Sequence, residues 1–187
     1  LVYPLARDAE QTTDYVEMQS KQPQLVIDSV RAFADPQFGV DLFKLESPVP
    51  AGDVPEPGSP GSAAVQALFD ELDRAAGRPW VMLSAGAGMT EFRRVLHYAY
   101  GAGASGYLAG RAIWLEAFQR FPDWVGIRDE LRGAAVPYMR ELNALTGTMA
   151  RPWDTHPCYG AAGARVARAV RRGRRSRLLL DRRCPDP

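Results

Sequence analysis

The chain has 187 residues, of which 46% are hydrophobic and 24% charged, and its formal net charge is +1. This length fits one ordinary domain and falls short of the ~250 residues typical of a closed eight-stranded α/β barrel. No apolar run approaches the ~20 residues that span a bilayer, and residues 1–5 lack the features of a signal peptide. The spacing of Cys158 and Cys184 suggests neither a disulfide framework nor a zinc site. We therefore expect a cytoplasmic protein that makes no membrane contact.

The small net charge conceals an acidic body and a basic end. Residues 1–160 carry 14 basic and 20 acidic side chains, whereas residues 161–187 carry nine basic and two acidic ones. Such an end attracts phosphate backbones and anionic lipids, but it has no interleaved aromatic residues and no nucleic-acid motif. We expect residues 161–187 to be a solvated tail or a tail foreign to the fold. Binding of nucleic acid or of an anionic surface through this tail is the weaker alternative.

Strand and helix signals alternate along the body of the chain. Short, unalternating apolar runs are typical of buried parallel strands, and apolar residues at helical spacing predict helices. Gly77 predicts the end of one helix and Thr90 the N-cap of the next. The predicted strands are 1–5, 40–46, 80–84 and 106–109, the predicted helices are 23–34, 62–76, 90–101, 111–121 and 126–146, and 51–61 is a loop. This order implies an α/β fold with a parallel sheet, either half of a barrel or a small doubly wound sheet.

Polar and small residues at the carboxyl ends of three predicted strands favour the barrel. In α/β barrels the chemistry lies at that end, and phosphate often binds after the last two strands. The residues concerned are Lys44 and Glu46, then Ser84 and Gly86, then Gly110 and Arg111.

Lys44 is the candidate nucleophile, because lysine is uncommon inside an apolar strand. Burial there would destabilise the ammonium and favour the neutral amine that attacks a carbonyl. Glu46 lies two positions further along and so projects to the same side, where its carboxylate could pair with the amine or transfer protons. A structural lysine–glutamate pair explains the same pattern equally well.

Two small-residue turns are candidates for phosphate binding. Ser84, Ala85 and Gly86 end one strand before a helix, where backbone N–H groups suit an anion and glycine allows close approach. Gly110 and Arg111 end the next strand, and a guanidinium can hold phosphate by two hydrogen bonds. Either turn alone could be an ordinary βα connection, but two on adjacent strands are more specific.

The remaining candidates have structural interpretations. We expect His97 to be a surface or packing residue within a helix. His156 follows the last predicted helix, where a structural role is favoured over one covering the site. Aromatic residues at helical spacing are predicted to lie in the core, namely Tyr98, Tyr100, Trp114, Phe118 and Phe121.

Three motifs carry a resemblance to a known family. Residues 41–48 (Asp-Leu-Phe-Lys-Leu-Glu-Ser-Pro), 83–86 (Leu-Ser-Ala-Gly) and 110–114 (Gly-Arg-Ala-Ile-Trp) resemble class I tagatose 1,6-bisphosphate aldolases, to which sulfofructosephosphate aldolases are closely related. The resemblance implies a (β/α)8 TIM barrel of which this chain holds strands 5–8. Residues 1–150 would form the C-terminal half of the barrel, and residues 151–187 a loop and arginine-rich tail. The acid/base glutamate of the family would fall just before Leu1.

The resemblance also implies a function. It suggests a Schiff-base aldolase that cleaves a ketose (bis)phosphate, such as tagatose 1,6-bisphosphate, to dihydroxyacetone phosphate and an aldehyde, without a cofactor or metal. Lys44 would form the Schiff base, and the turns at Ser84–Gly86 and Gly110–Arg111 would hold the phosphate of the sugar substrate. The full-length protein would be a homo-oligomer. A non-catalytic phosphosugar-binding remnant of the barrel is the alternative.

Overall fold

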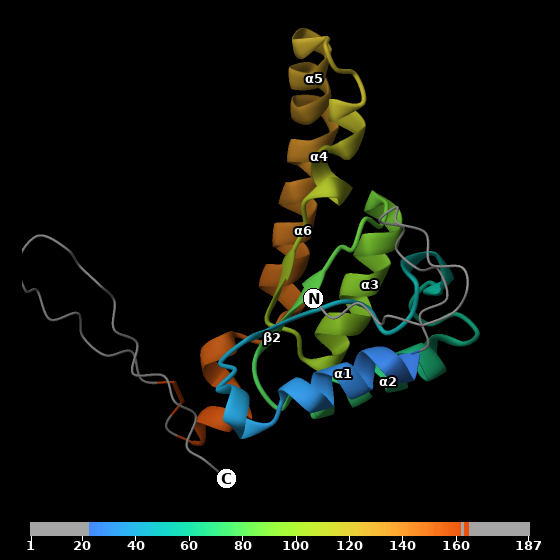
Figure 1. Ribbon diagram of the computed structural model, residues 1–187. Coiled ribbons are helices and arrows are strands. Elements are labelled where there is room, and N and C mark those ends of the chain that lie inside the picture. Colours follow the sequence, from blue (N-terminus) through green and yellow to red (C-terminus); the bar gives the residue numbers. More distant parts are fainter. Residues whose placement is uncertain (1–22, 162, 165–187) are drawn as a thin grey trace, which may run out of the picture.

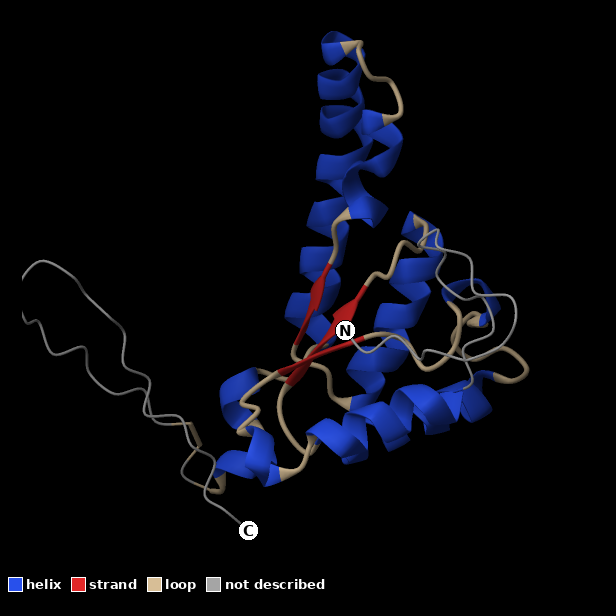
Figure 2. Cartoon of the chain, viewed as in Figure 1, coloured by secondary structure: helices blue, strands red, loops and turns tan. Residues whose placement is uncertain are grey.

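A parallel three-stranded sheet organises the fold. The structure, a computed structural model, describes residues 23–161, 163 and 164. The sheet has the order β1 (Phe43–Leu45), β2 (Trp80–Leu83) and β3 (Gly106–Leu108), and both neighbouring pairs are parallel (Figure 1). A helix follows each strand along the chain, and Figure 2 shows the strands in red among the helices in blue.

The helices agree with the predicted order. They are α1 (Pro23–Phe33), α2 (Ser62–Ala76), α3 (Met89–Ala102), α4 (Arg111–Phe118), α5 (Trp124–Glu130) and α6 (Val136–Met149), with the π-helical turn η3 (Leu131–Ala135) and the 3-10 turns η1 (Pro36–Phe38), η2 (Ala51–Asp53), η4 (Trp153–Thr155) and η5 (Pro157–Tyr159). Gly77 ends α2 in the left-handed conformation, as predicted. The strand predicted at residues 1–5 lies outside the described residues. No helix in the described part of the chain is long and apolar enough to cross a membrane.

Three predicted elements differ most from the structure in extent. The helix predicted at 111–121 ends at Phe118. The strand predicted at 40–46 pairs only over Phe43–Leu45. The helix predicted at 126–146 extends over Trp124–Met149 and changes its spacing at η3. Pro137 has no N–H to donate four residues back, which accounts for irregular spacing just before it.

One face of the sheet carries the core. Phe43 and Leu45 of β1 and Trp80 and Met82 of β2 are buried, since every second side chain of a strand points to the same face. Helix α3 packs between α2 and α6, so its buried positions surround most of the helix. They are Phe92, Val95, Leu96, Tyr98, Ala99, Tyr100 and Ala102, and the core prediction for Tyr98 and Tyr100 is therefore confirmed.

The opposite face of the sheet is open within the described residues. Lys44 lies on this face and is exposed, whereas its neighbours in β1 are buried. Leu108 of β3 is 45% exposed. The expected burial of Lys44 is therefore wrong for the described residues, because an apolar sequence around a lysine indicates the packing of its neighbours and not of the lysine itself.

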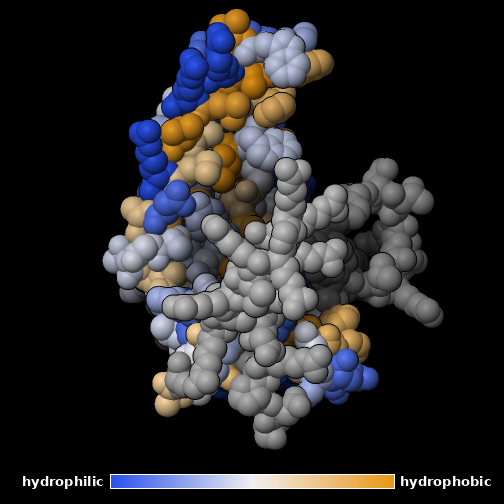
Figure 3. All heavy atoms as spheres, turned by 90° about the vertical axis from the view of Figure 1, so that its left-hand side faces the viewer, coloured by the Kyte–Doolittle hydropathy of each residue, from blue (hydrophilic) through white to orange (hydrophobic). Residues whose placement is uncertain are grey.

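Helices α4 and α5 leave the sheet and form, with part of α6, an arm that projects from the body (Figure 1). The core prediction for three aromatic residues of this region is wrong, because Trp114, Phe118 and Phe121 are 41%, 44% and 64% exposed. Helical spacing places residues on one face of a helix but does not say whether that face is covered. Figure 3 shows hydrophobic residues (orange) gathered on the upper part of the molecule and bordered by hydrophilic ones (blue).

The core and the arm should differ in how much stability is lost when a leucine side chain is truncated to alanine. Leu96→Ala, at a fully buried position of α3, should lower the free energy of unfolding by about 2–5 kcal/mol, because it leaves a cavity. Leu115→Ala, at a position on α4 that is 40% exposed, should cost less than about 1 kcal/mol. Urea unfolding followed by circular dichroism measures both changes, and equal losses would show that the arm is packed as tightly as the core.

Candidate active site

The carboxyl ends of the three strands surround one open hollow of about 410 Å³. The parallel register brings these ends to the same level, since Leu45 pairs with Met82 and Met82 with Tyr107. All of the residues predicted from the strand ends line this hollow, namely Lys44, Glu46, Ser84, Ala85, Gly86, Gly110 and Arg111. The rest of its lining is Leu83, Leu108, Ala109 and Trp114.

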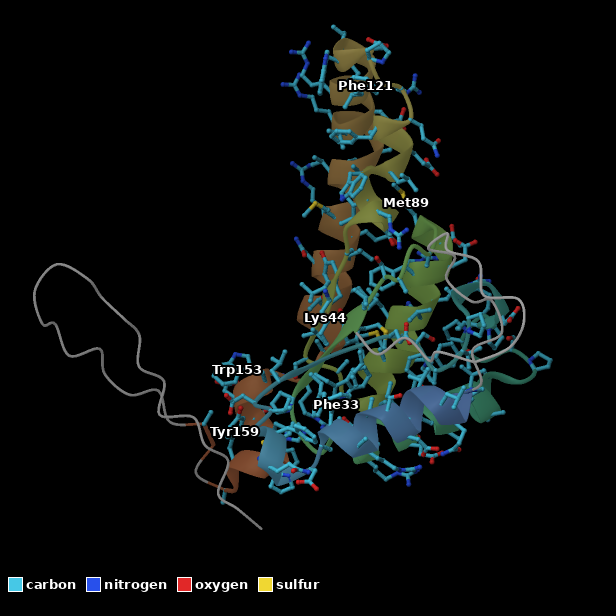
Figure 4. All side chains as sticks on the ribbon, viewed as in Figure 1. Phe33, Lys44, Met89, Phe121, Trp153 and Tyr159 are labelled. Carbon is cyan, nitrogen blue, oxygen red and sulfur yellow. The ribbon has the colours of Figure 1, made fainter. Side chains whose placement is uncertain are left out.

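Lys44 and Glu46 form one side of the hollow. Lys44 is the middle residue of β1, with its Cα in register with Val81, and its side chain lies on the open face of the sheet (Figure 4). Glu46 follows the end of the strand and is only 7% exposed. An accessible amine and a buried carboxyl group therefore line the same space. Lys44 is also the single lysine of the described residues.

The turn after β2 has an uncommon backbone conformation. Ala85 and Gly86 have φ angles of 49° and 81°, and the Ala87 N–H donates to the Ser84 carbonyl at 2.9 Å. Two successive left-handed residues make a turn that usually requires glycine or asparagine, and the left-handed conformation costs Ala85 roughly 1–2 kcal/mol. The Ser84 N–H donates to the Leu108 carbonyl at 3.0 Å, which ties the turn to β3. Backbone strain of this kind is often kept at ligand sites.

The start of α3 already has a carboxylate against it. The N-cap of α3 is Gly88, so the prediction that Thr90 caps this helix is wrong. A Cβ on Gly88 would collide with the Glu91 carboxylate, which therefore lies against the first turn and complements the positive end of the helix dipole. We expect an anion in the hollow to meet the Ser84–Gly86 turn and not the first turn of α3.

The turn after β3 carries Gly110, Arg111 and, one helical turn later, Trp114. The Gly110 carbonyl accepts hydrogen bonds from the N–H groups of Ile113 at 2.8 Å and Trp114 at 3.2 Å. Arg111 is the first residue of α4 and is exposed. The indole Nε1 of Trp114 lies 3.4 Å from the position that a Cβ on Gly110 would take.

The sequence prediction missed Trp114 as a residue of the hollow. A signal was present, because long side chains on a helix lean toward its N-terminus and cover the preceding turn. A tryptophan four residues after Gly110 is therefore expected to lie over the Gly110 turn. The prediction placed Trp114 in the core instead, because its helical spacing with Phe118 suggested a packed helix face.

Comparison with known proteins places the chain in a family. A family model described as DeoC/LacD family aldolase matches residues 1–116. The chain belongs to this family. It is 32% identical to the tagatose 1,6-diphosphate aldolase of Streptococcus agalactiae serotype V (strain ATCC BAA-611 / 2603 V/R) over 147 residues, which are 74% of this chain and 45% of that protein. The proteins of the same name from Lactococcus lactis subsp. lactis, at 31%, and Streptococcus pneumoniae (strain ATCC BAA-255 / R6), at 32%, are matched over the same shares of both chains.

The chain spans a little less than half the length of these curated relatives. Members of the DeoC/LacD aldolase family are TIM barrels. A parallel sheet with the order β1–β2–β3 and helical connections agrees with part of such a barrel.

The two histidines of this DeoC/LacD family chain lie outside the hollow. His97 is half-buried in α3. His156 is 6% exposed, and its Nδ1 accepts a hydrogen bond from the Cys158 N–H at 3.2 Å. Its segment is held near the amino ends of the strands, because the Arg151 N–H donates to the carbonyl of Ala104, just before β3. The structural role expected for His156 agrees with this position.

The burial of His156 should make stability depend on pH. Burial lowers the pKa of His156 below its usual 6.5 despite the nearby Asp73 carboxylate. Below pH 6.5 the unfolded chain therefore binds a proton that the folded chain does not, and stability is lost as the pH falls toward the lowered value. The slope from this residue is at most about 1.4 kcal/mol per pH unit.

The measurement is urea unfolding between pH 7.5 and 5. His156→Gln should flatten the fall in the free energy of unfolding, whereas His97→Gln retains His156 and should retain the fall. If both variants follow the parent profile, His156 does not contribute to the pH dependence.

Proposed function

We propose that the chain forms the Schiff-base half of a class I aldolase that cleaves a ketose phosphate, such as tagatose 1,6-bisphosphate, to dihydroxyacetone phosphate and an aldehyde. The observation that carries this proposal is the gathering of the lysine, the carboxyl group and two phosphate-type turns around one hollow. Family membership and the names of the relatives support the same reaction. No cofactor or metal is required by this chemistry.

We further infer that β1, β2 and β3 correspond to the sixth, seventh and eighth strands of the barrel. The one-sided packing of the sheet supports a place in the wall of a barrel. Parallel sheets normally have both faces covered, whereas here Lys44 and Leu108 leave one face open within the described residues. In a barrel that face points to the interior, where side chains from the other strands would cover it.

Lys44 supplies the nucleophile in the proposed reaction. Its amine adds to the C2 carbonyl of the ketose, and loss of water gives an iminium ion. A base removes the proton of the C4 hydroxyl, the C3–C4 bond breaks, and its electron pair moves onto the iminium to give an enamine while the aldehyde leaves. Protonation of the enamine at C3 and hydrolysis then release dihydroxyacetone phosphate and restore the amine. Glu46, buried beside the same hollow, is the group of this chain placed to transfer protons to and from the Schiff base.

The two turns orient the phosphate end of the substrate. The left-handed Ala85–Gly86 pair fixes the backbone at the edge of the hollow before a ligand arrives. Arg111, at the first position of α4, provides a guanidinium that can hold two phosphate oxygens. Binding of the phosphate in this way holds the carbonyl carbon near Lys44 in a fixed orientation. Such orientation of the reactants supplies a large share of the rate gain in reactions of this kind.

Borohydride trapping tests the nucleophile. Incubation of the chain with dihydroxyacetone phosphate and sodium borohydride should attach the ketone to one lysine, identified by peptide mapping. Because Lys21 is the only other lysine, Lys21→Met should retain full labelling and Lys44→Met should lose it. A label on Lys21 would contradict the proposal. Binding of dihydroxyacetone phosphate without any trapping would support the non-catalytic remnant.

Arg111 should affect the affinity of the phosphate. Arg111→Gln should raise the concentration of dihydroxyacetone phosphate that gives half-maximal trapping by about tenfold, because charge-assisted hydrogen bonds to the phosphate are lost. Arg128→Gln removes an exposed arginine on α5, outside the hollow, and should leave this concentration unchanged. Equal effects of the two substitutions would assign the loss to overall charge and not to the turn.

A further inference from the structure

The position of Trp114 suggests a role beyond packing. Its backbone N–H bonds to the Gly110 carbonyl, so it lies one turn into α4. Its indole leans back over the N-terminal turn of that helix. Nε1 lies 3.4 Å from the position that a Cβ on Gly110 would take, which is van der Waals contact. It thereby forms part of the wall of the hollow that contains Lys44 and Glu46.

The indole of Trp114 is partly exposed at the wall of the hollow. Trp114 is 41% exposed, and its ring makes an edge-on contact with Phe118 at a centroid distance of 5.7 Å. In the part of the chain that the structure describes, its side chain makes no hydrogen bond. An indole N–H is a donor only, so this position offers one directed donor beside the turn that carries Arg111.

We propose that Trp114 is a positioning residue for the phosphate-bearing end of the substrate. Its Nε1–H donates a hydrogen bond to a phosphate oxygen held at the Gly110–Arg111 turn, and the indole plane limits how far that oxygen can move. This inference rests on the proposed function. It adds a hydrogen-bond donor on the side of the hollow opposite β1.

A comparison within the arm separates this role from simple exposure of an apolar side chain. Trp124, on α5, is 63% exposed and makes an edge-on contact with Phe121 at 5.6 Å, an arrangement much like that of Trp114 with Phe118. Trp124 does not line the hollow. The two tryptophans therefore share exposure and aromatic packing and differ in their access to a ligand.

The experiment uses Trp114→Phe, which keeps an aromatic ring and removes the N–H, with Trp124→Phe as its matched control. The half-saturating concentration of dihydroxyacetone phosphate in borohydride trapping should rise about tenfold in Trp114→Phe, because a hydrogen bond to a charged group is lost. The labelled fraction at saturation should remain that of the parent chain. Trp124→Phe should match the parent in both quantities, and thermal melting checks that both variants are folded.

Tryptophan fluorescence gives a second readout that needs no reaction. Inorganic phosphate should change the emission of the parent chain and of Trp124→Phe, and should not change that of Trp114→Phe. If trapping on Lys44 occurs with the same half-saturating concentration in the parent and Trp114→Phe, the role of Trp114 is overturned and the proposed function stands. If Lys44 is not trapped but phosphate changes the emission of Trp114 alone, the proposed function is overturned and the phosphate contact stands. An emission change that persists in Trp114→Phe, or is absent from the parent, overturns the inference.

Discussion

The parallel register of β1, β2 and β3 is the constraint on which the candidate site depends. Parallel strands send their carboxyl ends to one edge, so residues more than 60 positions apart, such as Lys44 and Arg111, come to line the same hollow. The hydrogen bond from the Ser84 N–H to the Leu108 carbonyl continues this pairing just past β2. A slip of one residue in β1 would turn Lys44 toward the helices and bring Phe43 or Leu45 to the open face.

The two faces of the sheet separate the packed core from the candidate site. Trp80 is fully buried and its indole N–H donates to the Asp73 carboxylate at 2.7 Å, so the helix-covered face is both packed and hydrogen-bonded. On the other face the exposed Lys44 lies between the buried Phe43 and Leu45 of β1. Strand geometry thus allows a rigid core to support the proposed nucleophile one residue away, and an oriented reaction requires such rigid support.

The arm shows where sequence patterns lose their predictive value. Helical spacing gave the same prediction for Tyr98 and Tyr100 as for Trp114, Phe118 and Phe121, yet only the first two are buried. The difference lies in the neighbours, because α3 packs between α2 and α6, whereas α4 and α5 project from the body. Amphipathic spacing reports which residues share a side of a helix, and the partner of that side is a property of the tertiary structure.

By itself the sequence determined the order of the elements in residues 23–161, the ends of α1 and α2 to within one residue, and seven of the residues that line the hollow. Strand ends and small-residue turns are local signals, which is why they could be predicted. It did not determine the exposure of Lys44, the early start of α3 at Met89 or the position of the Trp114 indole over Gly110. These depend on which face of the sheet the helices cover and on where α4 points. Only the tertiary structure decides them, since contacts between elements distant in the sequence fix both.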